Sequence, residues 1–224
     1  MEETRDEYMN YSELKRNVER KGIKLWYTHS VNLTAMTGTL ICDWHGNIGD
    51  KIQYKLKLSP EYVAMCKKLD ALRLCSVRFE DKGDYLIAYP DYSFNSNGWT
   101  FISSEYRMNR YSIGYRTHIL YNGEILETDD SAVPYYYKDS WKHPEAFVGV
   151  WKDKLVYRSY DSIFMISKDG MIKFVGEYPS DSESGKVKLS IKDDVVNLSV
   201  YMYWDCDHHH GDWEDFHYDL KKIA

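Results

Sequence analysis

Apolar and polar residues alternate along most of the chain, which predicts a protein built mainly of β-strands. Residues 51–57 and 111–121 follow the two-residue period of a half-buried strand. The second run ends at Asn122-Gly123, a pair typical of the type I′ turn of a β-hairpin. From residue 147 to residue 220, further strand-like runs flank short turns that contain Lys and Asp. The pattern therefore predicts an antiparallel β-meander that forms a barrel or a sandwich.

Two segments near the N-terminus have the spacing of an amphipathic helix instead. Residues 8–21 carry apolar side chains three and four positions apart, and Gly22 ends the run. Residues 60–72 do the same after Ser59, a favourable N-cap, with Pro60 suited to the first helical position. We therefore expect an α+β fold that is predominantly antiparallel β.

The helical and strand patterns divide the chain into two portions. Residues 1–92 form the predicted α+β portion, which contains both helices, and residues 99–224 form the meander. The stretch between them is rich in Asn and Ser, as loops and boundaries often are. We expect one compact domain or two tightly packed subdomains.

Charge and hydropathy narrow the range of partners. The chain has 29 Lys and Arg against 35 Asp and Glu, which gives a formal net charge of −6. Proteins that bind nucleic acid or anionic membranes usually carry a basic excess, so we expect neither extended nucleic acid nor a membrane as the partner.

The apolar runs are too short to cross a bilayer, and the acidic N-terminus lacks a signal-peptide core. We expect a cytoplasmic protein.

Tyrosine is the most unusual part of the composition, with 21 Tyr beside 7 Trp and 7 Phe. Tyr and Trp are favoured at protein interfaces because they offer a large contact area at a small cost in entropy. The chain also lacks the G-x-S-x-G, P-loop and G-x-G-x-x-G motifs of common enzyme families. We therefore favour a non-enzymatic binding protein that needs no cofactor.

The leading hypothesis is that an aromatic and acidic surface docks a protein partner, with a basic partner favoured by the net charge. Inhibitors, immunity proteins and viral accessory proteins resemble this chain in composition. The aromatic residues that we expect in loops at such a surface are Tyr135, Tyr136, Tyr137, Trp141 and Trp213.

A cluster of histidines and carboxylates near the C-terminus supports a different hypothesis, a metal-dependent hydrolase or nuclease. His imidazoles with carboxylates suit zinc or manganese, and a catalytic centre needs three such ligands and an open position. The candidate ligands are His208, His210 and Asp212, with Asp207 or His217 as supplementary ligands. The competing interpretation is a solvated, acidic hairpin connection.

Interleaved arginine and tyrosine support a third hypothesis, a protein that binds a nucleotide or another small ligand. Arg107, Arg110, Tyr111 and Arg116 lie within one strand-like stretch. Guanidinium groups can contact phosphate while a tyrosine ring stacks on a base. The same pattern is ordinary on the outer face of a strand.

Overall fold

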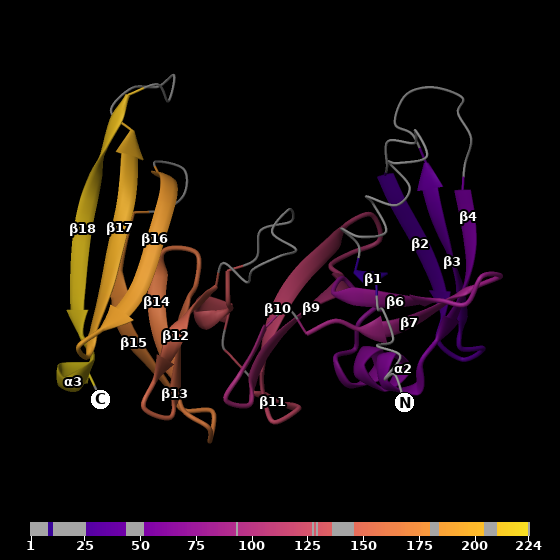
Figure 1. The fold of residues 1–224 in the computed structure, drawn as a ribbon, viewed down its shortest axis with the longest axis horizontal. Helices are drawn as coiled ribbons and strands as arrows, with labels where there is room; N and C mark the ends of the chain where they lie inside the picture. The colour runs from indigo at the N-terminus through magenta and orange to yellow at the C-terminus, as the bar shows by residue number, and fades with distance from the viewer. Residues whose placement is uncertain are drawn as a thin grey trace, which may run out of the picture. The chain divides into compact units, whose positions relative to one another are not determined.

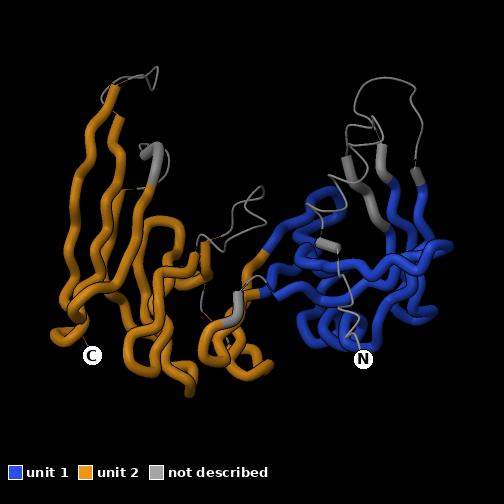
Figure 2. Tube along the Cα trace, in the orientation of Figure 1, with its two compact units in different colours: residues 1–92, 102–115 blue, residues 93–101, 116–224 orange. Residues whose placement is uncertain are grey.

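The computed structural model describes residues 9–10, 26–43, 52–92, 94–126, 128, 130–135, 146–179, 184–203 and 210–223. These residues form four mainly antiparallel sheets and little helix (Figure 1), so the predicted α+β, predominantly antiparallel fold is confirmed. No helix among them is long and apolar enough to span a membrane. The chain divides into two compact units, Met1–Tyr92 with Ile102–Tyr115 and Ser93–Phe101 with Arg116–Ala224 (Figure 2).

The first unit contains a six-stranded sheet in the order β1-β6-β7-β4-β3-β2. β4 and β7 pair in parallel, whereas the other neighbours are antiparallel. Leu40, Leu56 and Leu86 are almost completely buried in this unit. The strands are β1 (Met9–Asn10), β2 (Trp26–Asn32), β3 (Thr37–Asp43), β4 (Ile52–Leu58), β6 (Val77–Asp81) and β7 (Leu86–Pro90).

The helix predicted over residues 8–21 is wrong at its start. Met9 and Asn10 form β1 and pair with Phe79 and Arg78 of β6. Backbone pairing along the edge of β6 supplies hydrogen-bond partners that local helical spacing does not reveal. Residues 11–21 lie outside the described part of the chain.

The second predicted helix is present as α2 (Pro60–Lys68) and begins where the sequence indicates. The Ser59 side chain accepts a hydrogen bond of 3.0 Å from the Tyr62 backbone N–H, as an N-cap does. The helix ends four residues earlier than the predicted residue 72. Asp70 adopts a left-handed φ of 47°, and the Ala71 N–H donates to the Cys66 carbonyl at 2.9 Å. This is a Schellman end with aspartate at the position that glycine usually holds.

A second sheet has the order β11-β10-β9-β5, with β8 also paired to β9. β9 and β10 each contribute residues to both units. Asn122 and Gly123 between β10 and β11 have φ values of 48° and 83°, which confirms the predicted type I′ turn. The strands are β5 (Arg73–Leu74), β8 (Phe94–Ser96), β9 (Trp99–Arg107), β10 (Ile113–Tyr121) and β11 (Glu124–Leu126).

The meander of the second unit forms two further sheets, β12-β13-β14-β15 and β16-β17-β18. All of their neighbouring strands are antiparallel. The strands are β12 (Phe147–Trp151), β13 (Lys154–Arg158), β14 (Ser162–Ile166), β15 (Ile172–Glu177), β16 (Ser184–Lys192), β17 (Val195–Tyr203) and β18 (Gly211–Asp219). A 3₁₀ turn, η1 (Asp130–Ala132), precedes them, and α3 (Leu220–Ile223) follows.

The two central strands of the four-stranded sheet, β13 and β14, are buried on both faces. One face packs Val156, Ile163 and Met165 against the β16–β18 sheet, and the other packs Leu155, Tyr157 and Phe164 against residues of β9 and β10. Residues on both sides of β13 and β14 must therefore be apolar, which explains their unbroken hydrophobic runs. The two meander sheets therefore pack face to face within the second unit, and no closed barrel is present among the described residues.

Candidate functional site

Trp213 lies on the outer face of the β16–β18 sheet. Val196, Leu198 and Val200 of β17 point into the core, so the alternate residues of β17 point outward. The outward set includes Tyr201, which is directly opposite Trp213 of β18. The sheet therefore brings aromatic residues from two strands together on its outer face.

The aromatic side chains on this face stack edge to face. The Tyr201 ring centroid lies 5.4 Å from that of Tyr203, with an angle of 82° between the planes, and 5.4 Å from that of Trp213, with an angle of 71°. The Lys188 Nζ lies 3.8 Å from the centre of the Trp213 ring. All three aromatic residues are partly exposed. The name Trp213 face is used below for Lys188, Tyr201, Tyr203, Trp213 and Asp215.

Carboxylates line the strand that carries Trp213. Asp212, Glu214 and Asp215 are exposed on β18, and the Ser199 hydroxyl donates to Asp215 Oδ1 at 2.6 Å. β18 is an edge strand, with no further strand paired to its outer side among the described residues. Charges on an edge strand discourage aggregation, and they also present a binding surface to a cationic partner.

The candidate metal ligands are only partly within the described residues. His208 and Asp207 lie outside them, and His210 immediately precedes β18. Asp212 is opposite Met202, whereas His217 is opposite Asn197, so their side chains project from opposite faces of β18. The His217 Nδ1 is instead 2.9 Å from Asn197 Oδ1. No group of three or more His, Cys, Asp or Glu residues that could hold a metal ion occurs in the described parts of the chain.

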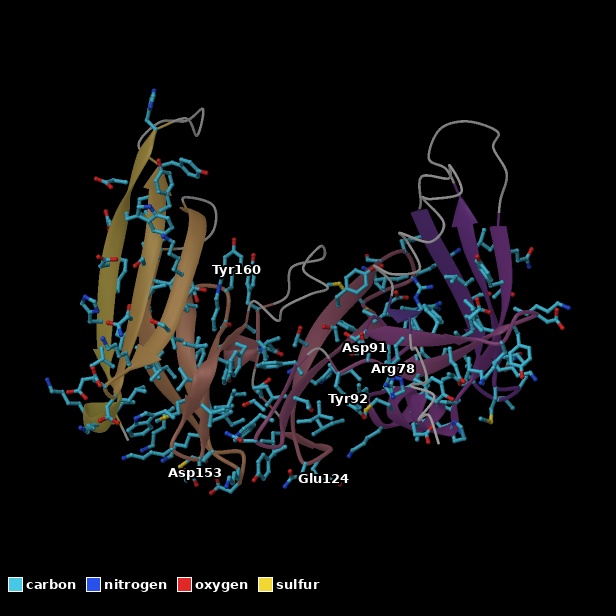
Figure 3. All side chains as sticks on the ribbon, viewed as in Figure 1. Arg78, Asp91, Tyr92, Glu124, Asp153 and Tyr160 are labelled. Carbon is cyan, nitrogen blue, oxygen red and sulfur yellow. The ribbon has the colours of Figure 1, made fainter. Side chains whose placement is uncertain are left out.

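Tyr135 has a structural environment in the second unit. Its ring centre lies 4.1 Å from the guanidinium carbon of Arg158, and its backbone N–H donates to the Arg158 carbonyl at 2.9 Å. Arg158 is only 5% exposed, and its Nε donates to the Tyr178 hydroxyl at 2.7 Å. Tyr160, labelled in Figure 3, contacts Tyr135 from outside at a centroid distance of 6.2 Å. Tyr135 therefore covers a buried arginine.

Three other residues are also predicted to contact a partner. Tyr136, Tyr137 and Trp141 lie outside the described residues. Their proposed role in partner binding stays a prediction.

The arginine and tyrosine residues of the third hypothesis separate into two groups. Arg107, Arg110 and Tyr111 are exposed around the loop between β9 and β10. Arg116 lies further along β10, where its Nη2 donates to the Thr128 carbonyl at 2.8 Å and its Nη1 is 3.5 Å from Asp130 Oδ1. Arg116 therefore ties β10 to the segment that begins η1.

Sequence reasoning missed three chemically distinctive residues, His118, Tyr201 and Tyr203. Burial, reinforced by the Arg116 guanidinium, lowers the pKa of His118 to about 4. Burial raises the pKa of the Cys66 thiol to about 11, and it also raises that of Cys75, so both thiols stay protonated and unreactive near neutral pH. Tyr201 and Tyr203 were also missed, although alternation from Val196 to Val200 would have placed them on the outer face.

Comparison of the chain with models of protein families, with curated proteins and with solved structures found no match.

Proposed function

We propose that this chain is a non-enzymatic binding protein that docks a protein partner through the Trp213 face. The supporting observation is the stack of Tyr203, Tyr201 and Trp213 on the same face as the exposed carboxylate of Asp215. Partly exposed aromatic rings held by one another lose little conformational entropy when a partner covers them. An aromatic and acidic surface of this kind suits a protein partner.

The chemistry of the face favours a basic partner. Asp215 is exposed and shares the outer face of β18 with Trp213, whereas Asp212 and Glu214, opposite Met202 and Val200, project from the other face of this edge strand. The Trp213 ring already holds the ammonium group of Lys188, so the ring is oriented for contact with a cation, and a cation of the partner would displace Lys188 from its π-face. A lysine or arginine of the partner would meet the Asp215 carboxylate beside the ring, and Lys188 would oppose its approach.

The opposite effects expected of two substitutions test this proposal. The untagged chain, coupled to beads, is used to capture proteins from a lysate of its source cells, followed by mass spectrometry. We expect the unaltered chain to retain a specific basic protein and the Trp213→Ala/Tyr201→Ala variant to lose it. The Lys188→Met variant should bind that protein about two- to fivefold more tightly, because a repelling charge is removed. Tyr92→Ala, which removes an exposed tyrosine of the other unit, is the matched control.

Two results would contradict the proposal. One is capture that survives loss of Trp213 and Tyr201 in a folded variant. The other is the absence of any protein retained above the level of empty beads. The Tyr136→Ala/Trp141→Ala variant, run in parallel, determines whether that segment contributes to the same surface.

A further inference from the structure

Large hydrophobic side chains gather at one end of the β9–β10 hairpin. Ten such side chains are exposed in the part of the chain that the structure describes, and half of them lie here: Tyr106, Met108, Tyr111, Ile113 and Tyr115. Tyr111 is 85% exposed and Met108 is 61% exposed. Single exposed apolar residues are ordinary, whereas a group of them marks an interaction site. Residues 106–113 are called the hairpin tip below.

The backbone of the hairpin tip is held in one conformation. Asn109 Oδ1 accepts hydrogen bonds from the Tyr111 N–H at 2.8 Å and from the Ser112 N–H at 2.9 Å. The Ser112 hydroxyl donates to the same oxygen at 2.8 Å, and the Met108 N–H donates to the Ser112 carbonyl at 3.1 Å. An ordered loop can bind a partner without first paying a large entropic cost.

A glycine allows the apolar side chains of the tip to lie across the hairpin. A Cβ added to Gly114 would be 2.6 Å from Tyr106 Cζ and 2.9 Å from Met108 Cγ. Gly114 is buried although the side chains above it are exposed. The tip is therefore a packed surface whose outer side faces solvent.

The charge of this surface is opposite to that of the whole chain. No Asp or Glu occurs from Tyr106 to Gly123, in a chain whose net charge is −6. The preceding carboxylate, Glu105, is buried and lies 2.6 Å from the Arg73 Nε. Arg107 and Arg110 are exposed, and neither forms an ion pair within the described residues. Arginine binds carboxylates through paired, directed hydrogen bonds.

The side chains at the tip favour a protein over a nucleic acid as the partner. Two exposed arginines neutralise few phosphates, whereas proteins that bind DNA typically contact several. Met108 and Ile113 offer apolar area that suits aliphatic side chains and does not stack on bases. Tyr, Met and Arg are all enriched at the centres of protein interfaces.

We propose that the hairpin tip docks an acidic, apolar segment of a partner protein, in which carboxylates meet Arg107 and Arg110 and apolar side chains cover Tyr111 and Met108. The tip belongs to the first unit and the Trp213 face to the second, and the two surfaces have opposite charge preferences. This inference therefore does not rest on the proposed function, and either can fail alone.

An array of short synthetic peptides with systematically varied Glu, Lys, Leu and Tyr content tests this inference. The fluorescently labelled full-length chain is applied to the array, and the peptide that binds best is then titrated in solution. We expect bound peptides to be rich in Glu together with Leu or Tyr. We expect Arg107→Gln/Arg110→Gln and Tyr111→Ala each to weaken binding about tenfold or more, as loss of a central interface residue does.

Matched controls separate the tip from general charge effects. Lys55→Gln/Lys67→Gln removes two exposed positive charges elsewhere in the first unit, and Tyr92→Ala removes an exposed tyrosine outside the hairpin tip. Both should leave peptide affinity within about twofold of the unaltered chain, well below a tenfold loss. The inference is overturned if bound peptides show no acidic preference, if the arginine variant retains full affinity, or if single-stranded oligothymidylate binds more tightly than the best peptide.

Discussion

Lys188 of β16 reaches diagonally across β17 to Trp213 of β18. Lys188 is directly opposite Ser199, whose partner on β18 is Asp215, yet its Nζ lies 3.8 Å from the centre of the Trp213 ring two positions away. The ammonium group thereby covers an aromatic face that would otherwise meet solvent. A single interaction thus links the outer two strands of the sheet.

This cation–π contact should be measurable by a double-mutant cycle. Lys188→Ala and Trp213→Ala together should destabilise the protein by less than the sum of their separate effects, with a coupling of about 0.5–1 kcal/mol for a partly exposed pair. Urea unfolding of the four proteins measures it. Lys192, on the same strand and face but opposite Val195, provides the control cycle with Trp213, for which we expect no coupling.

The buried Arg158 should make the Tyr178 hydroxyl important for stability. That hydroxyl accepts from Arg158 Nε at 2.7 Å and donates to the Ser159 carbonyl at 2.7 Å. Tyr178→Phe removes this hydrogen-bond partner from the Arg158 Nε and from the Ser159 carbonyl, and should lower the free energy of unfolding by about 2 kcal/mol. Tyr160→Phe deletes a hydroxyl from an exposed ring and should change it by less than about 0.5 kcal/mol. Equal effects of the two substitutions would contradict a structural role for this network.

His118 should make stability depend on pH in the mildly acidic range. Its pKa falls from 6.5 to about 4 on folding because burial and Arg116 disfavour the charged ring. Between these values the unfolded chain binds more protons than the folded chain, so stability is complete above the unfolded pKa and declines as pH falls towards the folded one. The loss should amount to about 2 kcal/mol, allowing for partial exposure of the ring.

Chemical denaturation across this pH range gives the free energy of unfolding of the unaltered chain and of His118→Gln. Because the carboxylates titrate in both proteins, the difference between them gives the contribution of His118. The difference between the free energies of unfolding of the two proteins should no longer depend on pH above about pH 7, where the unfolded imidazole is already neutral. His217→Gln, which changes an exposed histidine, should retain the pH dependence. Identical dependence of stability on pH in His118→Gln and in the unaltered chain would show that folding does not change the pKa of His118.

Metal analysis discriminates the binding hypothesis from the hydrolase hypothesis. Asp212 and His217 point to opposite faces of β18, so they cannot share one ion. We expect the untagged, gel-filtered chain to hold far less than one equivalent of zinc or manganese. We also expect His208→Ala/His210→Ala to have unchanged stability when either metal is added. Stoichiometric metal that is lost in this variant would instead support a catalytic centre in the segment before β18.

Local features of this fold were predictable from the sequence because local forces determine them. The start of α2 follows from Ser59 and Pro60, and the turn at Asn122-Gly123 from two residues that tolerate positive φ. The end of α2 was missed because Asp70 occupies the left-handed position, where glycine is the usual signal.

Features that depend on distant partners were not predictable in this way. The parallel pairing of β4 with β7 depends on which strand edges meet in the folded sheet, and so does the pairing of the short strand β1 with β6. The alternation of apolar and polar residues within a strand does not predict which strand will be its neighbour. Among site residues, Trp213 was expected in a loop, but it lies within β18 and is partly exposed. Arg116 gave no sign that it would bind Asp130 and the Thr128 carbonyl.

Hydrogen exchange of the chain with and without its captured partner tests the central claim most directly. Protection of backbone amides in β17 and β18, strongest around Tyr201 and Trp213 and absent in the Trp213→Ala variant, is the result that we expect. Protection confined to residues outside the β16–β18 sheet, or unchanged by loss of Trp213, would contradict partner binding at the Trp213 face.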